Sequence, residues 1–175
     1  MIRIAFFAVA ALTLVACGGA AQEQGSSFED VPAWVDNPAR DCAVGENKFR
    51  GNRSTAREAA TAKARTELAK QLNVKVQSLF KNYASEGEAE GQDFTEELIE
   101  SFSRQITDQT LTGTRPTRTK KSGEYLYVEV CFDPENLANA FDRMDKLSNT
   151  ARAALKRRAQ AMENSLDAQL DKQAE

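Results

Sequence analysis

One apolar stripe constrains the fold of this 175-residue chain more than any other feature. After Thr55, apolar residues recur every three or four positions, which is the period of an α-helix with one buried face. Thr55 and Glu58 have the spacing of a capping box, which predicts where this helix begins. Alanines fill the first half of the stripe, so we expect the helix to lie close against a sheet. The stripe consists of Ala56, Ala60, Ala64, Leu68, Leu72, Val76, Leu79 and Tyr83.

Two regions of the chain supply the β-structure. Residues 41–49 are bounded by turn formers and predict a first strand. A threonine-rich segment, 110–119, is followed by a second strand, and the pair predicts a β-hairpin that turns at 120–123. Pro116 predicts an edge strand or a bulge, because proline donates no hydrogen bond to the ladder. In the last strand the apolar residues alternate, which predicts one buried face: Leu126, Val128, Val130 and Phe132.

Helices are expected on either side of this hairpin. A second helix is predicted to bury four residues spaced by four, namely Phe94, Leu98, Phe102 and Ile106. From Pro134 onward the pattern is helical to the end of the chain, with proline tolerated in the first turn. The predicted fold class is α+β, with a small three-stranded antiparallel-type sheet packed by helices. Its order is strand, helix, helix, strand, strand, and a long C-terminal helix follows.

The segment before the first strand, Pro32 to Pro38, contains two prolines and predicts an extended lead-in without regular helix. Trp34 lies between these prolines, and we expect its indole to pack on the domain. A ligand-binding role for Trp34 is the alternative interpretation. Because it is the only tryptophan, its fluorescence would report such binding.

The N-terminal residues resemble an export signal. One cation, Arg3, precedes an uncharged run from Ile4 to Ala16, which is shorter than the about 20 apolar residues of a membrane-spanning helix. Leu14 to Cys17 resembles a bacterial lipobox, whose cysteine receives a diacylglyceryl group and whose amine receives an acyl chain such as palmitate. This resemblance implies a chain that starts at Cys17 and is anchored to a bilayer without spanning it. Gly18 is not the aspartate that retains lipoproteins in the inner membrane, so the resemblance implies the outer membrane.

The cysteine count agrees with an exported protein. Once Cys17 is set aside, Cys42 and Cys131 remain as an even pair. In an oxidising compartment such a pair predicts one disulfide. Two small buried thiols are the alternative.

The chain divides into four predicted regions. They are a signal peptide, 1–16; a lipidated flexible tether, 17–31; an α/β lipoprotein domain, 32–137; and a charged C-terminal helix, 138–175. An apolar stripe on the last helix is too long for so small a domain to cover. We therefore expect this stripe to fray in water or to contact a partner helix, and its residues are Leu147, Ala151, Leu155, Met162, Leu166 and Leu170.

The composition excludes the common catalytic sites. Histidine is absent from the sequence, which removes the commonest general base and the commonest zinc ligand. With the cysteines lipidated or paired, no thiolate nucleophile or metal ligand is left. The sequence therefore predicts no catalytic residue, no metal and no cofactor.

Each of two charge clusters can be interpreted either as a binding site or as an ordinary charged surface. An acidic cluster lacks the spacing of a calcium loop and is expected to be a solvated face: Glu86, Glu88, Glu90, Asp93, Glu96, Glu97 and Glu100. A basic patch on the hairpin could meet anionic lipid or an acidic protein, or could simply protect an edge strand: Arg115, Arg118, Lys120 and Lys121. Nucleic acid is not an expected partner of an exported protein.

Four segments together resemble the Lpp-twenty bacterial lipoprotein family of FlgP-like outer-membrane lipoproteins. They are PAWV at 32–35, AVG at 43–45, the alanine-rich helix 56–69 running into QLNVKVQS at 71–78, and YLYVEV at 125–130. The resemblance covers about residues 32–137. It implies a compact α/β domain without known catalysis. Some relatives build rings or discs around the flagellar motor, and others are surface or periplasmic antigens.

The function expected from these observations is that of a non-enzymatic envelope lipoprotein, acting as a structural or protein-interaction module. Its partners would be the membrane, reached through the acyl chains, and either a second copy of the chain or another envelope protein. A ligand-binding carrier or sensor in the periplasm is the alternative.

Overall fold

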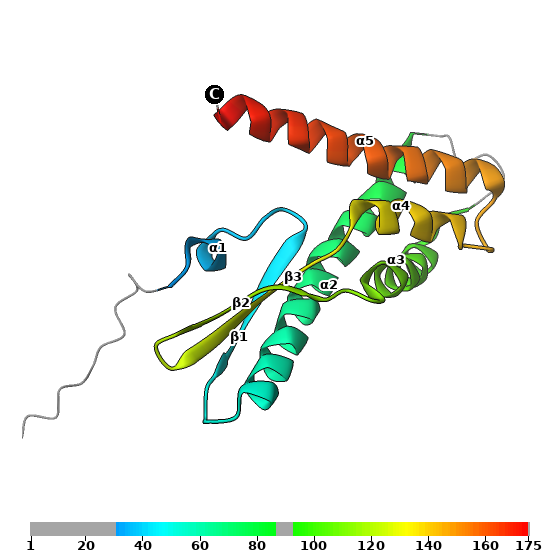
Figure 1. Ribbon diagram of the computed structural model, residues 1–175. Helices are drawn as coiled ribbons and strands as arrows, with labels where there is room; N and C mark the ends of the chain where they lie inside the picture. The colour runs from blue at the N-terminus through cyan, green and yellow to red at the C-terminus, as the bar shows by residue number, and fades with distance from the viewer. Residues whose placement is uncertain (1–30, 87–92, 175) are drawn as a thin grey trace, which may run out of the picture.

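The computed structural model describes residues 31–86 and 93–174, and the side chains of 31–86 and 93–164. The strands form one three-stranded sheet, and the helices gather along one long helix (Figure 1). The predicted α+β class and its element order are confirmed. The elements are α1 (Ala33–Asp36), β1 (Cys42–Lys48), α2 (Arg53–Ser85), α3 (Glu96–Leu111), β2 (Pro116–Ser122), β3 (Tyr125–Cys131), α4 (Pro134–Asp142) and α5 (Asn149–Ala174).

The sheet is antiparallel and has the order β1-β3-β2, so β3 is central and β2 is an edge strand. The register of β2 shifts between Pro116 and Arg118, which leaves Thr117 as the extra residue of a bulge. Both consequences expected of Pro116 are therefore confirmed. The hairpin turns later than predicted, at Gly123 and Glu124, because β2 extends to Ser122.

The predicted stripe of α2 is buried along its whole length. Its alanines face β1 at Gly45, where a Cβ atom would lie 2.1 Å from the Ala60 carbonyl oxygen and 2.4 Å from the Ala64 nitrogen. Only glycine permits this approach, because any side chain would overlap helix backbone. The expected close packing of helix on sheet is thereby confirmed.

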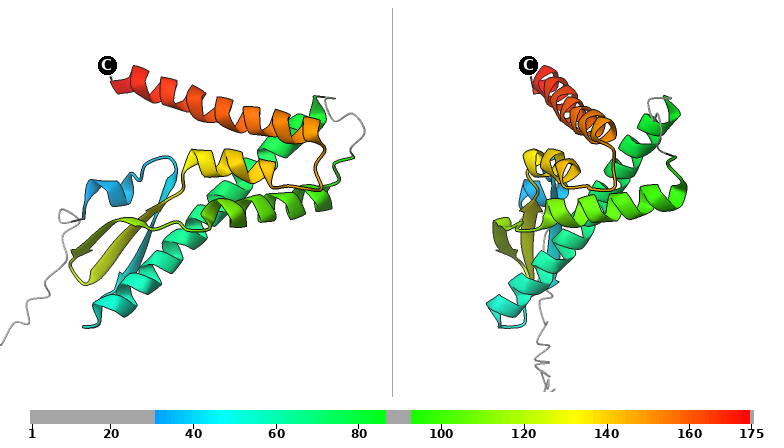
Figure 2. Two further views of the ribbon diagram at one scale, coloured as in Figure 1. Left: turned by 45° about the vertical axis from the view of Figure 1, so that its right-hand side comes forward. Right: turned by 90° about the vertical axis from the view of Figure 1, so that its right-hand side faces the viewer.

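The second half of α2 runs past the sheet, and α3, α4 and α5 gather there (Figure 2). Phe80 of α2 is central to this region, since its ring centroid lies 5.7 Å from that of Phe102 and 6.1 Å from that of Phe141. The aromatic rings join α2, α3 and α4 into one core. This core and the sheet's core form a single hydrophobic cluster.

Three local predictions are corrected. Helix α2 begins at Arg53, and its cap is Asn52, whose Oδ1 accepts a hydrogen bond from the Thr55 nitrogen at 3.2 Å. In α3, Ile99 is buried where Leu98 was predicted to be, and Leu98 is 39% exposed. The helix begins at Glu96, and the face that it turns to the core includes Ile99 and not Leu98. The lead-in contains one short helix, α1, because Pro32 and Pro38 flank its four residues rather than interrupt them.

The single C-terminal helix predicted for 138–175 is also corrected. The chain forms two helices, α4 and α5, and the region boundary at 137/138 falls inside α4. Ser148 accepts a hydrogen bond at Oγ from the Ala151 nitrogen, at 3.1 Å, and so starts α5 as a new helix. Met144 and Leu147 are buried in the connection, which turns the chain back over the core.

The hydrophobic core of the described residues is built from one part of the chain. All core contacts of the described residues come from the segment between Cys42 and Met162, including the partly buried residues packed against the cluster. A chain that starts at Gly18 therefore keeps every residue of this core.

We predict that Gly45→Ala lowers the free energy of unfolding by about 3 kcal/mol, because the new methyl group overlaps the backbone of α2. Gly113→Ala is the matched control. Gly113 has φ of +83° with nothing within 4 Å of an added Cβ, so only backbone strain of about 1 kcal/mol is expected. Urea unfolding measures both, and an equal loss in the two variants would contradict the close approach of α2 to β1.

Candidate functional site

A disulfide joins strand β1 to its neighbour β3. The Sγ atoms of Cys42 and Cys131 are 2.02 Å apart, and the two residues are direct partners in the register of β1 and β3. The neighbouring pair carries the ladder hydrogen bond, from the Phe132 nitrogen to the Asp41 oxygen at 3.0 Å. Cys42 and Cys131 thus form a non-hydrogen-bonded pair, the type that brings side chains closest. The predicted bridge is confirmed, and the alternative of two thiols is wrong.

A buried carboxylate lies beside this bridge on the sheet face that points away from α2. Glu129 is 2% exposed, and its Oε2 accepts a hydrogen bond from the Thr117 hydroxyl at 2.8 Å. The Arg118 Nε lies 3.4 Å from the same oxygen, while Oε1 has no protein partner among the described residues. The bulge explains the arrangement, since it places Thr117 over β3. Glu129 and the two sulfurs are within ligand distance of one another, but bonded sulfurs offer no thiolate to a metal ion.

Four charged side chains meet at the start of β1, in what we call the four-charge cluster: Arg40, Asp41, Lys75 and Glu163. Arg40 Nη2 lies 2.8 Å from Glu163 Oε2 and 3.3 Å from Asp41 Oδ2. Lys75 Nζ pairs with Glu163 and lies 3.4 Å from Asp41 Oδ1. The four side chains are only 8–23% exposed, so water screens them weakly.

The cluster connects three parts of the chain. Arg40 and Asp41 precede β1, Lys75 belongs to the middle of α2, and Glu163 belongs to α5. Lys75 also lies over the Phe132 ring, 5.4 Å from its centroid. Two cations and two carboxylates balance, which favours a structural role in positioning α5 over chemistry on a substrate.

Sequence reasoning missed the four-charge cluster because each member looks like ordinary surface charge. One signal was available. Lys75 stands beside Val76 on a helix whose buried stripe includes Leu72 and Leu79, and Glu163 follows half-buried Met162 on α5. A charge at the border of an apolar stripe is a candidate for burial with a partner.

The partner-binding stripe predicted on the C-terminal helix is corrected. Leu147, Ala151 and Leu155 are at most 2% exposed and belong to the domain's own core. Met162 is half-buried against that core. These side chains are covered because α5 folds back over α4 and α2, so they are not a surface for a partner. The side chains of Leu166 and Leu170 lie outside the described residues.

Trp34 is half-buried in α1. Helix α1 lies near Tyr127, whose pKa is raised, first by burial and then by the negative charges of Glu46 and Asp36 and by neighbouring Tyr125. The four surface hollows described for this domain are lined by residues of other elements. No contact of the described residues marks Trp34 as a ligand site.

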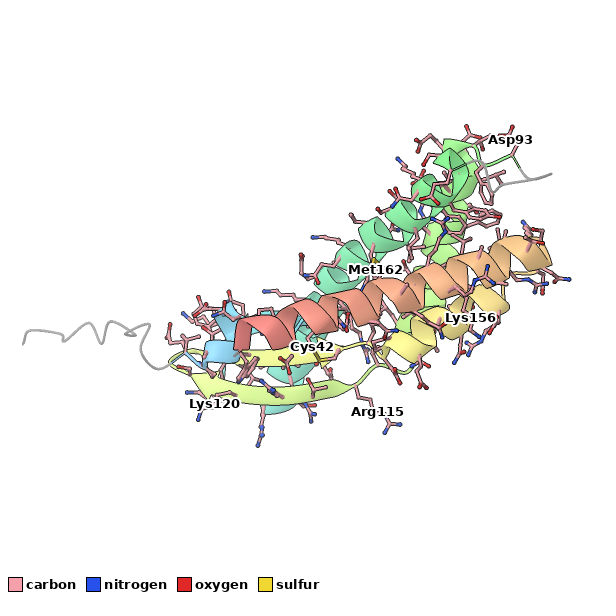
Figure 3. All side chains as sticks on the ribbon, turned by 90° about the horizontal axis from the view of Figure 1, so that it is seen from above. Cys42, Asp93, Arg115, Lys120, Lys156 and Met162 are labelled. Atoms are coloured by element: carbon pink, nitrogen blue, oxygen red, sulfur yellow. A yellow bond between two sulfur atoms is a disulfide. The ribbon has the colours of Figure 1, made fainter. Side chains whose placement is uncertain are left out.

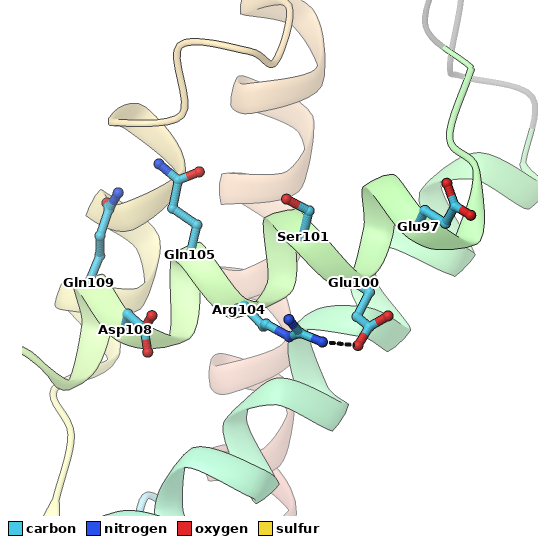
Figure 4. Close-up of a pocket in the computed structure, with 7 residues that line it drawn as sticks. All are labelled: Glu97, Glu100, Ser101, Arg104, Gln105, Asp108 and Gln109. Carbon is cyan, nitrogen blue, oxygen red and sulfur yellow. Dashed lines mark hydrogen bonds and ion pairs between the residues drawn. The ribbon is translucent and has the colours of Figure 1, made fainter.

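One of these hollows lies along α3 and has a volume of about 460 Å³ (Figure 4). All of its lining residues come from this one helix, and all are polar: Glu97, Glu100, Ser101, Arg104, Gln105, Asp108 and Gln109. Arg104 pairs with Glu100 one turn away. A hollow lined by a single helix has no second wall from which catalytic groups could converge on a substrate.

Three residues of the acidic cluster pair with three different cations. Glu86 pairs with Arg158, and this hydrogen bond holds the pKa of the carboxyl below its usual value. Glu96 Oε1 lies 3.2 Å from Lys81 Nζ, and Glu100 pairs with Arg104. Glu88 and Glu90 lie outside the described residues. Carboxylates already paired with separate cations are typical of a solvated face, as predicted.

The predicted anchor, Cys17, also lies outside the described residues. Within the part of the chain that the structure describes, no helix has both the length and the apolar character needed to cross a membrane.

We predict that Lys75→Met lowers the free energy of unfolding by about 3 kcal/mol, because it leaves Glu163 and Asp41 buried with less positive charge. The double variant Lys75→Met/Glu163→Gln is expected to lose less than the sum of the single variants. Lys70→Met is the control, because Lys70 is 69% exposed and should cost less than about 0.5 kcal/mol. Additive losses in the double variant would show that the two charges are not coupled.

We also predict that a reductant lowers the free energy of unfolding by about 4 kcal/mol, because the bridge joins residues 89 positions apart. Urea curves with and without reductant measure the effect. The variant Cys42→Ser/Cys131→Ser should unfold like the reduced protein and ignore the reductant. Coincident curves for the unmodified protein would contradict a stabilising bridge.

Comparison with known proteins gives no assignment for this chain. No protein-family model matches it, and no curated protein matches it.

Proposed function

We propose that this protein is a non-enzymatic lipoprotein of the bacterial envelope, anchored to the outer membrane through acyl chains on Cys17. The observation that carries the proposal is the sequence from Leu14 to Cys17, which follows an uncharged run of signal-peptide length. Its domain serves as a structural or protein-interaction module. Association with the flagellum is the specific process that the family resemblance implies.

The disulfide supports export. Disulfides form and persist in oxidising compartments and are rare in the cytosol. The Cys42–Cys131 bridge links paired strands at the edge of the core, where it stabilises the fold and has no thiol left to react. This is the use of cysteine expected in a periplasmic domain.

The charged and polar groups support a module without catalysis. The sequence has no histidine. Among the described residues, the buried charges occur in the four-charge cluster and in the contacts of Glu129, and each of these has a structural explanation. Helices α3, α4 and α5 share one hydrophobic core with α2, an arrangement that suits a protein that positions a surface for a partner.

The anchor is tested by cell fractionation. We predict that Cys17→Ser moves the protein from the membrane fraction to the soluble fraction when the membranes are washed at high salt, which removes electrostatic binding. The substitution should also abolish labelling by a palmitate analogue, because the thioether-linked lipid cannot form. Gly19→Ala is the control, since it keeps the thiol and should stay in the outer-membrane fraction. A Cys17→Ser protein that remains in the membrane fraction would overturn the anchor, and with it this proposal.

A further inference from the structure

One end of the domain is strongly basic, although the chain as a whole has a net charge of −3. Two segments, 46–54 and 120–125, meet there, because Lys48 is the register partner of Tyr125 and the Phe49 nitrogen donates to the Glu124 oxygen at 2.7 Å. They carry two carboxylates, Glu46 and Glu124, against five cations, a net charge of +3. We call these five residues the basic end: Lys48, Arg50, Arg53, Lys120 and Lys121.

The basic end faces solvent. All five residues are exposed, and the side chain of Lys48 is 48% exposed. Lys48 pairs with Glu124. The other four residues form no ion pair with any described residue. Their positive charge is therefore available to an outside anion.

The fold adds further positive potential at the same place. Helix α2 has 33 residues and begins at Arg53, so the positive end of its dipole lies within the basic end. Its first turn contains no acidic residue, and a cation there is unfavourable for the helix. Arg53 therefore does not stabilise the start of α2, and the stability of the domain does not explain its presence there.

Protection of an edge strand explains only part of the basic end. Lysines on β2 discourage pairing with another chain, which accounts for Lys120 and Lys121. Arg50 and Arg53 lie outside β2, in the connection to α2 and at its first residue. A single surface that binds anions accounts for all of them.

The described chain begins on the same side of the molecule. Figure 1 shows α1 on the side of the molecule where the β2–β3 hairpin turns, and Figure 3 labels Lys120 on that side. Between Cys17 and Val31 the chain spans at most about 48 Å. An acyl anchor on Cys17 would therefore keep the basic end within reach of the membrane surface.

We propose that the basic end docks on the anionic headgroups of the membrane that holds the anchor. This inference rests on the proposed function. The acyl chains supply the attachment, and the cations orient the domain by pairing with lipid phosphates. Tyr125 is 38% exposed beside these cations, and tyrosine is favoured at the boundary between lipid and water. Docking turns the sheet end toward the bilayer and leaves the helical end, with α3 and the start of α5, facing away from it.

The test uses the unlipidated chain from Gly18 to Glu175, which keeps the whole core. Its sedimentation with vesicles of phosphatidylcholine alone and of phosphatidylcholine mixed with phosphatidylglycerol is measured at low and high salt. We expect binding to the mixed vesicles only, weakened by salt. Arg50→Gln/Lys120→Gln should bind about thirtyfold more weakly, since each cation contributes a factor of about five.

The control is Lys70→Gln/Arg104→Gln, which makes the same charge change on the α2–α3 surface at side chains 69% and 68% exposed. It should bind like the unmodified chain. Equal binding to both vesicle types, no binding to either, or equal weakening by the control would overturn the inference and leave an acidic protein as the partner of the basic end. The outcome does not depend on lipidation, so it is separate from failure of the Cys17 anchor.

Discussion

The close approach of α2 to β1 is the constraint on which the rest of the structure depends. At Gly45 the strand has no side chain, and the alanines of α2 leave its backbone almost in contact with the sheet. The helix is longer than the sheet, so packing one half tightly on the strands projects the other half beyond them. The projecting half carries Phe80 and Tyr83, around which α3, α4 and α5 are arranged.

One corner of the domain combines covalent and ionic links. Cys42 is bonded to Cys131, and the adjacent residues Asp41 and Phe132 both contact Lys75 of α2. Through Glu163 the same lysine reaches α5. Strands β1 and β3, helix α2 and helix α5 are thus linked at one place. These links hold α5 in position, although few apolar side chains of α5 pack on the core.

The charge of the domain is distributed unevenly, and this matters more for function than its net value. The sheet end is basic, whereas the acidic residues of α3 and the end of α2 lie at the helical end and pair with separate cations. In the proposed docking, this positive end turns toward an anionic membrane surface. The helical end would then be the part presented to the proposed envelope partner.

The sequence by itself determined the features that depend on local periodicity and on counting. These are the buried stripe of α2, the alternating face of β3, the edge position of Pro116 and the pairing of two cysteines once Cys17 is set aside. Only the tertiary structure decided which side of α3 is buried, where the C-terminal helix divides, and that Leu147, Ala151 and Leu155 belong to the core. It also brought Arg40 and Glu163 together across 123 positions. The physical reason is that burial and ion pairing at these sites come from contacts between distant segments, which no local pattern records.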